Sequence, residues 1–346
     1  MRILLNGVGR IGKSIIRLAN SKNLEIVAIN EINHNIENIA YLINYDSTYG
    51  KLQDKYFVRN QFIYNSQSTI KILNYANLHD IDFQGLDIDI VIDASGVPYK
   101  KEFLESLEID AIFLTHPTNE ADINLILGVN ELQLIGDEKI ISTSSCNATA
   151  LLPYLKVIDD HYTIVSGDIL TIHPLLNHQK TLDSKCISSS DRDVSCNFEF
   201  GRSATQNIIP SKTTTIEACS YVDKRFNSDL LSSSSLRVPT PTVGAINVVL
   251  NVSNELNSNQ LNRLLEEYAQ KQQYPIYKNI TEQLVSTDFQ GEEFTTIIDT
   301  KFTQITNNTT IKSVIWYDNE YGYASKVIEI VNRYIMVKST NIQQGK

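Results

Sequence analysis

One cysteine of this sequence stands where a nucleophile could act, and one histidine is a candidate base. Cys146 follows Ser-Thr-Ser-Ser, between an apolar β-like run and a helical pattern. A cysteine at a helix N-terminus faces unpaired amides and the positive end of the helix dipole, which stabilise a thiolate. His173 ends the run Ile-Leu-Thr-Ile-His, and histidine suits proton transfer near neutral pH. A small buried cysteine and a structural histidine are the alternative interpretations.

A glycine-rich turn near the start has the pattern of a dinucleotide-binding loop. Gly7, Gly9 and Gly12 follow a β-like run and open a helical pattern. They permit a tight turn, close approach of the backbone to a pyrophosphate, and close packing of helix on strand. Glu31 ends the second β-like run, where a carboxylate accepts the ribose hydroxyls of NAD and repels the 2′-phosphate of NADP. The pattern favours NAD, and a glycine turn with a capping acid is the alternative.

The elements that must position these residues change in character along the chain. Residues 1–145 alternate short apolar β-like runs with helical patterns, which predicts a Rossmann-like doubly wound parallel sheet in an α/β NAD-binding domain. Residues 146–321 open with a helical pattern and then carry β-like runs with one further clear helical pattern among them, which predicts an α+β catalytic domain with a mainly antiparallel sheet. An amphipathic C-terminal helix, within about 322–346, is expected to complete the first domain.

The predicted elements are short. The predicted strands are Arg2–Asn6, Glu25–Asn30, Asp89–Ala94, Ala111–Thr115, Asn124–Gly128, Lys139–Ser142, Val165–His173, Ser235–Val238, Val243–Val252, Thr295–Asp299 and Ile311–Tyr317. The predicted helices are Arg10–Asn20, Asn147–Asp160 with Pro153 inside it, Gln260–Gln272 and Gly322–Met336. Two serine-rich stretches, Ser188–Ser190 and Ser232–Ser235, are predicted surface loops.

Composition and charge exclude several classes of protein. The 346 residues carry 30 Lys and Arg against 40 Asp and Glu, a formal net charge of −10, which argues against nucleic acid or an anionic membrane as the main partner. We find no apolar run of the ~18 residues that a membrane span needs. The start lacks the apolar run of a secretory signal, so we expect a cytoplasmic protein with reduced thiols. The cysteines show no CxxC spacing and predict no metal site.

Longer segments of the chain resemble phosphorylating glyceraldehyde-3-phosphate dehydrogenase and its relative erythrose-4-phosphate dehydrogenase. The matching segments keep the family's order over nearly the whole length, and the 27 residues from Cys146 to His173 are the family's own spacing. The segments are NGVGRIGK at the start, SSCNATALLP, LTIH, IIP at 208–210, RVPTP at 237–241 and WYDNEYGYASKV at 316–327.

The resemblance implies a role for each matching position. Cys146 would be the nucleophile and His173 the base of an NAD-dependent enzyme that forms a homotetramer. The positions implied for the cofactor are Gly7, Gly9, Arg10, Ile11 and Gly12 at the pyrophosphate, Glu31 at the adenosine ribose, Ser95 and Thr115 in the cleft, and Asn319 and Tyr323 at the nicotinamide. The positions implied for substrate or phosphate are Ser145, Asn147, Thr213 and Arg237, with Arg202 as a further candidate.

Departures from the family's pattern gather at the phosphate-binding positions. Asn147 stands where the family usually has a threonine, and Leu176 replaces a phosphate-binding threonine. The family's double-arginine loop gives way to a longer stretch between Gln179 and Ile208, in which Arg202 aligns with the last arginine. An apolar residue at the position of Leu176 is similar to the erythrose-4-phosphate branch.

Three hypotheses follow from these residues. The first is NAD-dependent phosphorylating oxidation of glyceraldehyde 3-phosphate, a step of glycolysis, in which inorganic phosphate resolves a cysteine thioester to an acyl phosphate. The second is oxidation of erythrose 4-phosphate, with water or phosphate as the acyl acceptor. The third is an NAD-binding paralogue with weak catalysis, which Cys146, His173, Arg237 and Asn319 argue against.

Glu31 generates a test of cofactor choice. We expect Glu31→Ala to weaken NAD binding and to reduce the difference in kcat/KM between NAD and NADP, because the carboxylate repels a 2′-phosphate. The measurement is kcat/KM with each cofactor. Equal values for the two cofactors in the unmodified protein would show that the assignment of Glu31 is wrong.

Overall fold

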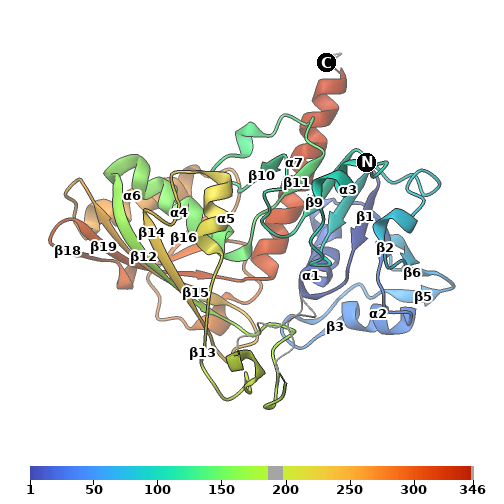
Figure 1. The fold of residues 1–346 in the computed structure, drawn as a ribbon, viewed down its shortest axis with the longest axis horizontal. Coiled ribbons are helices and arrows are strands. Elements are labelled where there is room, and N and C mark those ends of the chain that lie inside the picture. Colours follow the sequence, from blue (N-terminus) through green and yellow to red (C-terminus); the bar gives the residue numbers. More distant parts are fainter. Residues whose placement is uncertain (186–197, 344–346) are drawn as a thin grey trace. The chain divides into compact units, whose positions relative to one another are not determined.

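A computed structural model describes residues 1–185 and 198–343. The predicted loop Ser188–Ser190 therefore lies outside the described residues, as do Cys186 and Cys196. The chain divides into two compact units, of which the first joins Met1–Thr149 to Glu320–Lys346 and the second is Ala150–Asn319. Figure 1 labels the elements of both units.

The first unit contains a nine-stranded sheet within the described residues, and its central strands are parallel. The strands in sheet order are β10 (Ile123–Asn124), β11 (Ile140–Ser142), β9 (Ala111–Leu114), β8 (Ile90–Asp93), β1 (Ile3–Asn6), β2 (Ile26–Asn30), β7 (Thr69–Leu73), β6 (Phe62–Tyr64) and β5 (Phe57–Arg59). Its helices are α1 (Arg10–Ala19), α2 (Ile36–Asn44), α3 (Lys101–Glu105) and α7 (Tyr321–Gln343), and a small sheet pairs β3 (Tyr45–Asp46) with β4 (Gly50–Lys51). The predicted Rossmann-like sheet is confirmed.

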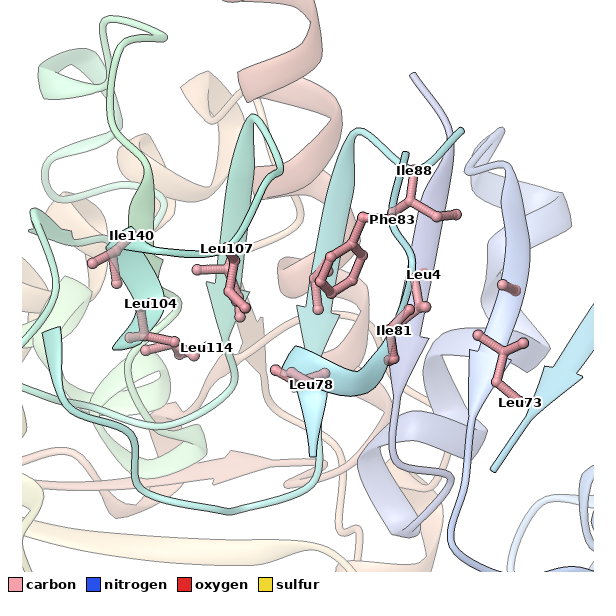
Figure 2. Close-up of a cluster of buried hydrophobic side chains, with 13 residues drawn as sticks. Leu4, Leu73, Leu78, Ile81, Phe83, Ile88, Leu104, Leu107, Leu114 and Ile140 are labelled. Atoms are coloured by element: carbon pink, nitrogen blue, oxygen red, sulfur yellow. The ribbon is translucent and has the colours of Figure 1, made fainter. Parts of the chain in front are cut away.

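Apolar side chains of several strands form a core on one face of this sheet (Figure 2). Leu4 of β1 and Leu114 of β9 are buried, because the central strands are covered on both faces. Leu78, in the short 3-10 helix η2 (Leu78–Asp80), lies in the same cluster with Phe83 and Leu104. Helices α1 and α7 pack against each other, so the C-terminal helix belongs to the first unit.

The glycine turn between β1 and α1 has a steric explanation. Gly7 has a φ of +89°, and a Cβ there would lie 2.9 Å from the backbone of Ser95. A Cβ on Gly12 would lie 2.1 Å from the carbonyl oxygen of Gly7. Gly9 differs, because a Cβ there would meet no atom within 4 Å. Gly7 and Gly12 therefore close the turn, whereas the space beside Gly9 is open.

The second unit contains an eight-stranded, mainly antiparallel sheet within the described residues, as predicted. Its strands in sheet order are β13 (Ile209–Ser211), β14 (Leu231–Arg237), β12 (Ile164–His173), β15 (Gly244–Val252), β19 (Thr310–Tyr317), β17 (Thr296–Asp299) and β16 (Tyr277–Ile280), with β18 (Gln304–Thr306) paired to β19. Its helices are α5 (Thr215–Val222) and α6 (Ser258–Lys271), together with most of α4 (Cys146–Tyr162). Helix α4 continues through Pro153.

Two predicted elements are wrong. The stretch Ser232–Ser235 is not a loop but part of β14, because backbone pairing with β12 on one side and β13 on the other holds its serines in the sheet. The predicted strand Asn124–Gly128 is paired only at Asn124. The Leu125 amide still donates to the Ser142 carbonyl, at 2.8 Å. From there Asn130 replaces the strand partner, since its side chain accepts from the Ile126 amide at 3.0 Å and donates to the Asn124 carbonyl at 2.9 Å.

The structure contains no helix that is both long and apolar enough to cross a membrane, within the residues that it describes.

The two glycines of the turn generate a matched pair of variants. We expect Gly12→Ala to lower the free energy of unfolding by roughly 1–3 kcal/mol, because its Cβ would collide with a backbone carbonyl. Gly9→Ala is the control, since its φ of −70° suits alanine and its Cβ would have open space. Urea unfolding measures both, and equal stability of the two variants would contradict the packing argument.

Candidate active site

Cys146 is the first residue of α4, one position earlier than the helix predicted from the sequence. Ser145 caps this helix, since its Oγ accepts from the Ala148 amide at 3.2 Å and its carbonyl accepts from the Thr149 amide at 2.8 Å. Cys146 is half-buried, and its Sγ lies 3.5 Å from Oδ1 of Asn147. The thiol therefore sits among the amides of a helix start, where a thiolate is stabilised.

The start of α1 offers backbone amides to an anion. Its N-cap is Gly9, which has no side chain that could accept a hydrogen bond from the first amides of the helix. The amides of Arg10 and Ile11 open the helix, and such a start is an anion site. The Arg10 guanidinium is engaged elsewhere, with NH1 2.7 Å from Asp46 and Nε 2.8 Å from Glu320. Any contact of Arg10 with a pyrophosphate is thus left to its backbone.

Glu31 lies beside this turn, as its sequence position predicts. Its Oε2 accepts from the Val8 amide at 2.8 Å, and its Oε1 accepts from the Asn33 amide at 3.1 Å. The open space at Gly9 and the carboxylate at Glu31 fit a dinucleotide, whose pyrophosphate needs close approach to backbone and whose ribose offers hydroxyl donors.

A buried polar network, which the motif search did not single out, lies below the turn. The Asn30 amide group donates to Asn6 Oδ1 at 2.8 Å, and Asn6 donates to Asp93 Oδ1 at 2.6 Å. These three residues end β2, β1 and β8, so a polar residue closing each buried strand was the available signal. Burial raises the pKa of Asp93 to about 6. Its Oδ2 has no hydrogen-bond partner among the described residues.

Two predicted cofactor residues attach to this network. Ser95 Oγ donates to Asp93 Oδ1 at 2.8 Å, and Thr115 Oγ1 donates to the Asp93 carbonyl at 3.0 Å. Both residues follow the carboxyl ends of parallel strands, β8 and β9, where open α/β sheets bind their ligands. The first unit thus gathers Gly9, Glu31, Ser95 and Thr115 at the ends of adjacent strands.

In the second unit His173 ends β12 and pairs in register with Arg237 of β14. Its Nδ1 lies 2.9 Å from the carbonyl oxygen of Pro174. A carbonyl can only accept, so Nδ1 carries the hydrogen and Nε2 is the basic nitrogen. Burial, followed by the charge of Arg237, lowers the pKa of His173 to about 3. The imidazole is therefore neutral at physiological pH, as a base must be.

The expected phosphate ligands are spread over separate elements of this unit. Arg237 is close enough to His178 that burial and the arginine's charge lower the pKa of that histidine. Thr213 precedes α5, and its Oγ1 lies 2.6 Å from that of Thr215. Arg202 is turned to Asp183, with Nε 2.9 Å from the carboxylate, and its side chain is 63% exposed.

Asn319 is held by one end of its amide. Its Oδ1 accepts from Thr242 Oγ1 at 3.0 Å and from the Val243 amide at 3.1 Å. The NH₂ end is thereby fixed as the donor end of the side chain. Thr242, which the sequence search missed, is the residue that sets this orientation.

The remaining predicted residue, Tyr323, lies in α7 of the first unit. Its side chain is buried, and its hydroxyl bonds to the residues just before Cys146. Cys146 belongs to the first unit and His173 to the second. No group of three or more His, Cys, Asp and Glu side chains suited to a metal ion occurs in the part of the chain that the structure describes.

Comparison with known families agrees with this arrangement. Residues 1–101 match the NAD-binding domain of glyceraldehyde 3-phosphate dehydrogenase, and residues 145–319 match its C-terminal domain. The fold and the site define an NAD-dependent dehydrogenase. The chain belongs to the glyceraldehyde 3-phosphate dehydrogenase family, and its cofactor is NAD.

The buried carboxyl of Asp93 generates a prediction about stability and pH. Because its folded pKa, about 6, lies above its ordinary value of 3.8, the folded state holds the proton more tightly, and stability falls as pH rises through 6. We expect Asp93→Asn to be more stable than the parent near pH 7 by on the order of 1–3 kcal/mol, with the difference shrinking as pH falls from about 6 to 3.8.

Urea unfolding of both proteins across this pH range measures the difference, and subtraction removes other titrating groups such as His173. Asp87→Asn is the matched control, because the Asp87 side chain is 82% exposed. A stability difference for Asp93→Asn that is flat with pH would show that this carboxyl does not titrate with folding.

Proposed function

We propose that this dehydrogenase oxidises glyceraldehyde 3-phosphate to an acyl phosphate, with Cys146 as the nucleophile. The observation that carries the proposal is the place of Cys146 at the first position of α4, half-buried at the positive end of the helix. A thiolate there can attack the aldehyde carbon and form a hemithioacetal. The Cys146 amide is a candidate donor to the oxygen of that adduct.

His173 is proposed to take the proton of the adduct's hydroxyl through Nε2. Its Nδ1 donates to the Pro174 carbonyl, and burial keeps the ring neutral, so Nε2 is the nitrogen with a lone pair for the proton. NAD, when bound, supplies the acceptor for the hydride that leaves the carbon. The carbon is then a thioester of Cys146, and attack by a phosphate oxygen expels the thiolate and releases the acyl phosphate.

The other proposed roles concern binding. The NH₂ end of Asn319 suits the carboxamide oxygen of a nicotinamide, because Thr242 and Val243 occupy its other end. Arg237 and Thr213 are proposed to hold the substrate phosphate or the attacking phosphate, since a guanidinium and a hydroxyl are suited donors. Assembly into a homotetramer in the cytoplasm stays a prediction of the family resemblance.

Oxidation of erythrose 4-phosphate is the second candidate, favoured by the weakened anion sites. Leu176 offers no donor, and Asp183 neutralises the one arginine that aligns with the family's pair, Arg202. Inorganic phosphate would then meet few donors and act as a poor acyl acceptor, leaving water to hydrolyse the thioester. Each lost donor to a charged ligand costs ~1.5–3 kcal/mol.

The nucleophile and the substrate are tested together. We expect iodoacetamide to alkylate Cys146 at neutral pH much faster than Cys219, whose thiol pKa is raised by complete burial. NADH formation should fall in step with labelling of Cys146 and vanish in Cys146→Ser. Peptide mapping measures the labelling, and Cys219→Ser is the control that should keep both activity and labelling of Cys146.

Steady-state assays with each aldehyde, with and without phosphate, distinguish the candidates. A higher kcat/KM for glyceraldehyde 3-phosphate and a requirement for phosphate support the first. A preference for erythrose 4-phosphate with release of free acid supports the second. Full activity of Cys146→Ser, or NAD binding without turnover of either aldehyde, would refute both.

A further inference from the structure

The residue two places before Cys146 has an unusual backbone. Ser144 has a φ of +59°, in the left-handed region that residues with a Cβ seldom adopt. It is fully buried, and its Oγ has no hydrogen-bond partner among the described residues. The serine side chain therefore does not explain the conformation. Such strained positions persist only where the surroundings hold them.

Hydrogen bonds hold both peptide groups of Ser144. Its N–H donates to Ser142 Oγ at 3.1 Å, and that hydroxyl donates to the carbonyl of His116 at 2.8 Å. Its carbonyl accepts from the hydroxyl of Tyr323 at 2.9 Å. Thr143 Oγ1 lies 2.9 Å from the same Tyr323 hydroxyl and 3.1 Å from the carbonyl oxygen of Leu114, so its one hydrogen is shared between these two acceptors.

Tyr323 is well placed to act as a fixed donor. It lies in α7, far along the chain, and only 3% of its surface is exposed. Burial raises the pKa of its hydroxyl, so the group stays protonated over the whole working range of pH. Water cannot readily replace a hydrogen bond that is closed off in this way.

We propose that Tyr323, supported by Thr143, is a positioning residue for the Cys146 nucleophile, because its hydroxyl holds the left-handed turn at Ser144 that sets Cys146 at the start of α4. The inference rests on the proposed role of Cys146. It differs from the contact implied by family resemblance, which concerns the ring of Tyr323 and the nicotinamide. Here the hydroxyl serves the nucleophile, whether or not a cofactor is bound.

The turn connects directly to the thiol. Ser145 follows Ser144 and caps α4 through the Ala148 amide, so a change of φ and ψ at Ser144 redirects the cap. Cys146 then loses its alignment with the start of the helix, and its thiolate loses the stabilisation that the helix dipole gives. A glycine at position 144 would adopt the same turn without strain, and would depend less on the hydrogen bond from Tyr323.

The experiment measures alkylation of Cys146 by iodoacetamide as a function of pH, with neither NAD nor aldehyde present. We expect Tyr323→Phe, which keeps the ring, to slow alkylation at neutral pH about tenfold and to move its pH profile upward. NAD affinity, measured by calorimetry, should change less than about twofold. Thr143→Val should act in the same direction with a smaller effect, and serves as the second variant should Tyr323→Phe not fold.

Rescue separates positioning from general stability. We expect Ser144→Gly to alkylate like the parent, and the double variant Ser144→Gly, Tyr323→Phe to recover most of the lost rate, because glycine removes the strain that the hydroxyl holds. A folded Tyr323→Phe with an unchanged pH profile would overturn the proposal. So would failure of the glycine to rescue, or a fall in NAD affinity that parallels the fall in alkylation.

Failure of the proposed reaction is recognised separately. If the parent protein oxidises neither aldehyde while Tyr323→Phe still slows alkylation and Ser144→Gly rescues it, the proposed function is wrong. The positioning role of Tyr323 is then still supported.

Discussion

The positive ends of two helices are the feature on which the candidate site depends. Helix α1 begins at Arg10 after a glycine, and α4 begins with Cys146 itself. Each start concentrates partial positive charge where the proposed function places an anion, a pyrophosphate at α1 and a thiolate at α4. A charged side chain at either place would be less fixed than the backbone of a helix start. The lysines and arginines of the chain are consequently available for other tasks, as the ion pairs of Arg10 illustrate.

Buried ionisable groups of opposite tendency accompany these helix starts. Asp93 binds its proton more tightly in the folded chain, and His173 binds its proton less tightly. Both shifts have desolvation as their main cause, because each burial disfavours the charged form. The consequence for stability runs in opposite directions, since the buried histidine favours folding as pH rises and the buried acid opposes it.

Much of the fold was predictable because buried strands and amphipathic helices leave strong patterns. The run before Gly7 and the helix after Gly9 were placed within a residue or two. Pattern failed where a side chain or a neighbouring strand takes over the backbone, as Asn130 does below residue 124 and as β12 and β13 do for the serines of β14. Helix α5 was missed for another reason, because few large apolar residues mark the face of the helix that is buried.

The sequence could propose candidate site residues where the chemistry depends on residue type, and could not where it depends on distant contacts. Residue type and place in a motif were enough to identify Cys146, His173 and Glu31 as candidates. The hydrogen bond from Tyr323 to the Ser144 carbonyl joins residues 179 positions apart, and no local sequence pattern indicates it. The same holds for the network from Asn30 to Asp93, where the strands meet only in the folded sheet.

The return of α7 to the first unit has a consequence for how the protein is made. Helix α1 packs against α7, and Arg10 and Lys22 bond to Glu320, just before α7, and to Glu329 within it. On the ribosome, residues 150–319 are synthesised between the N-terminal strands and α7. The N-terminal strands therefore leave the ribosome well before the helix that completes their unit. The nascent first unit therefore exposes the surface that α7 later covers, and is a natural client for chaperones until synthesis ends.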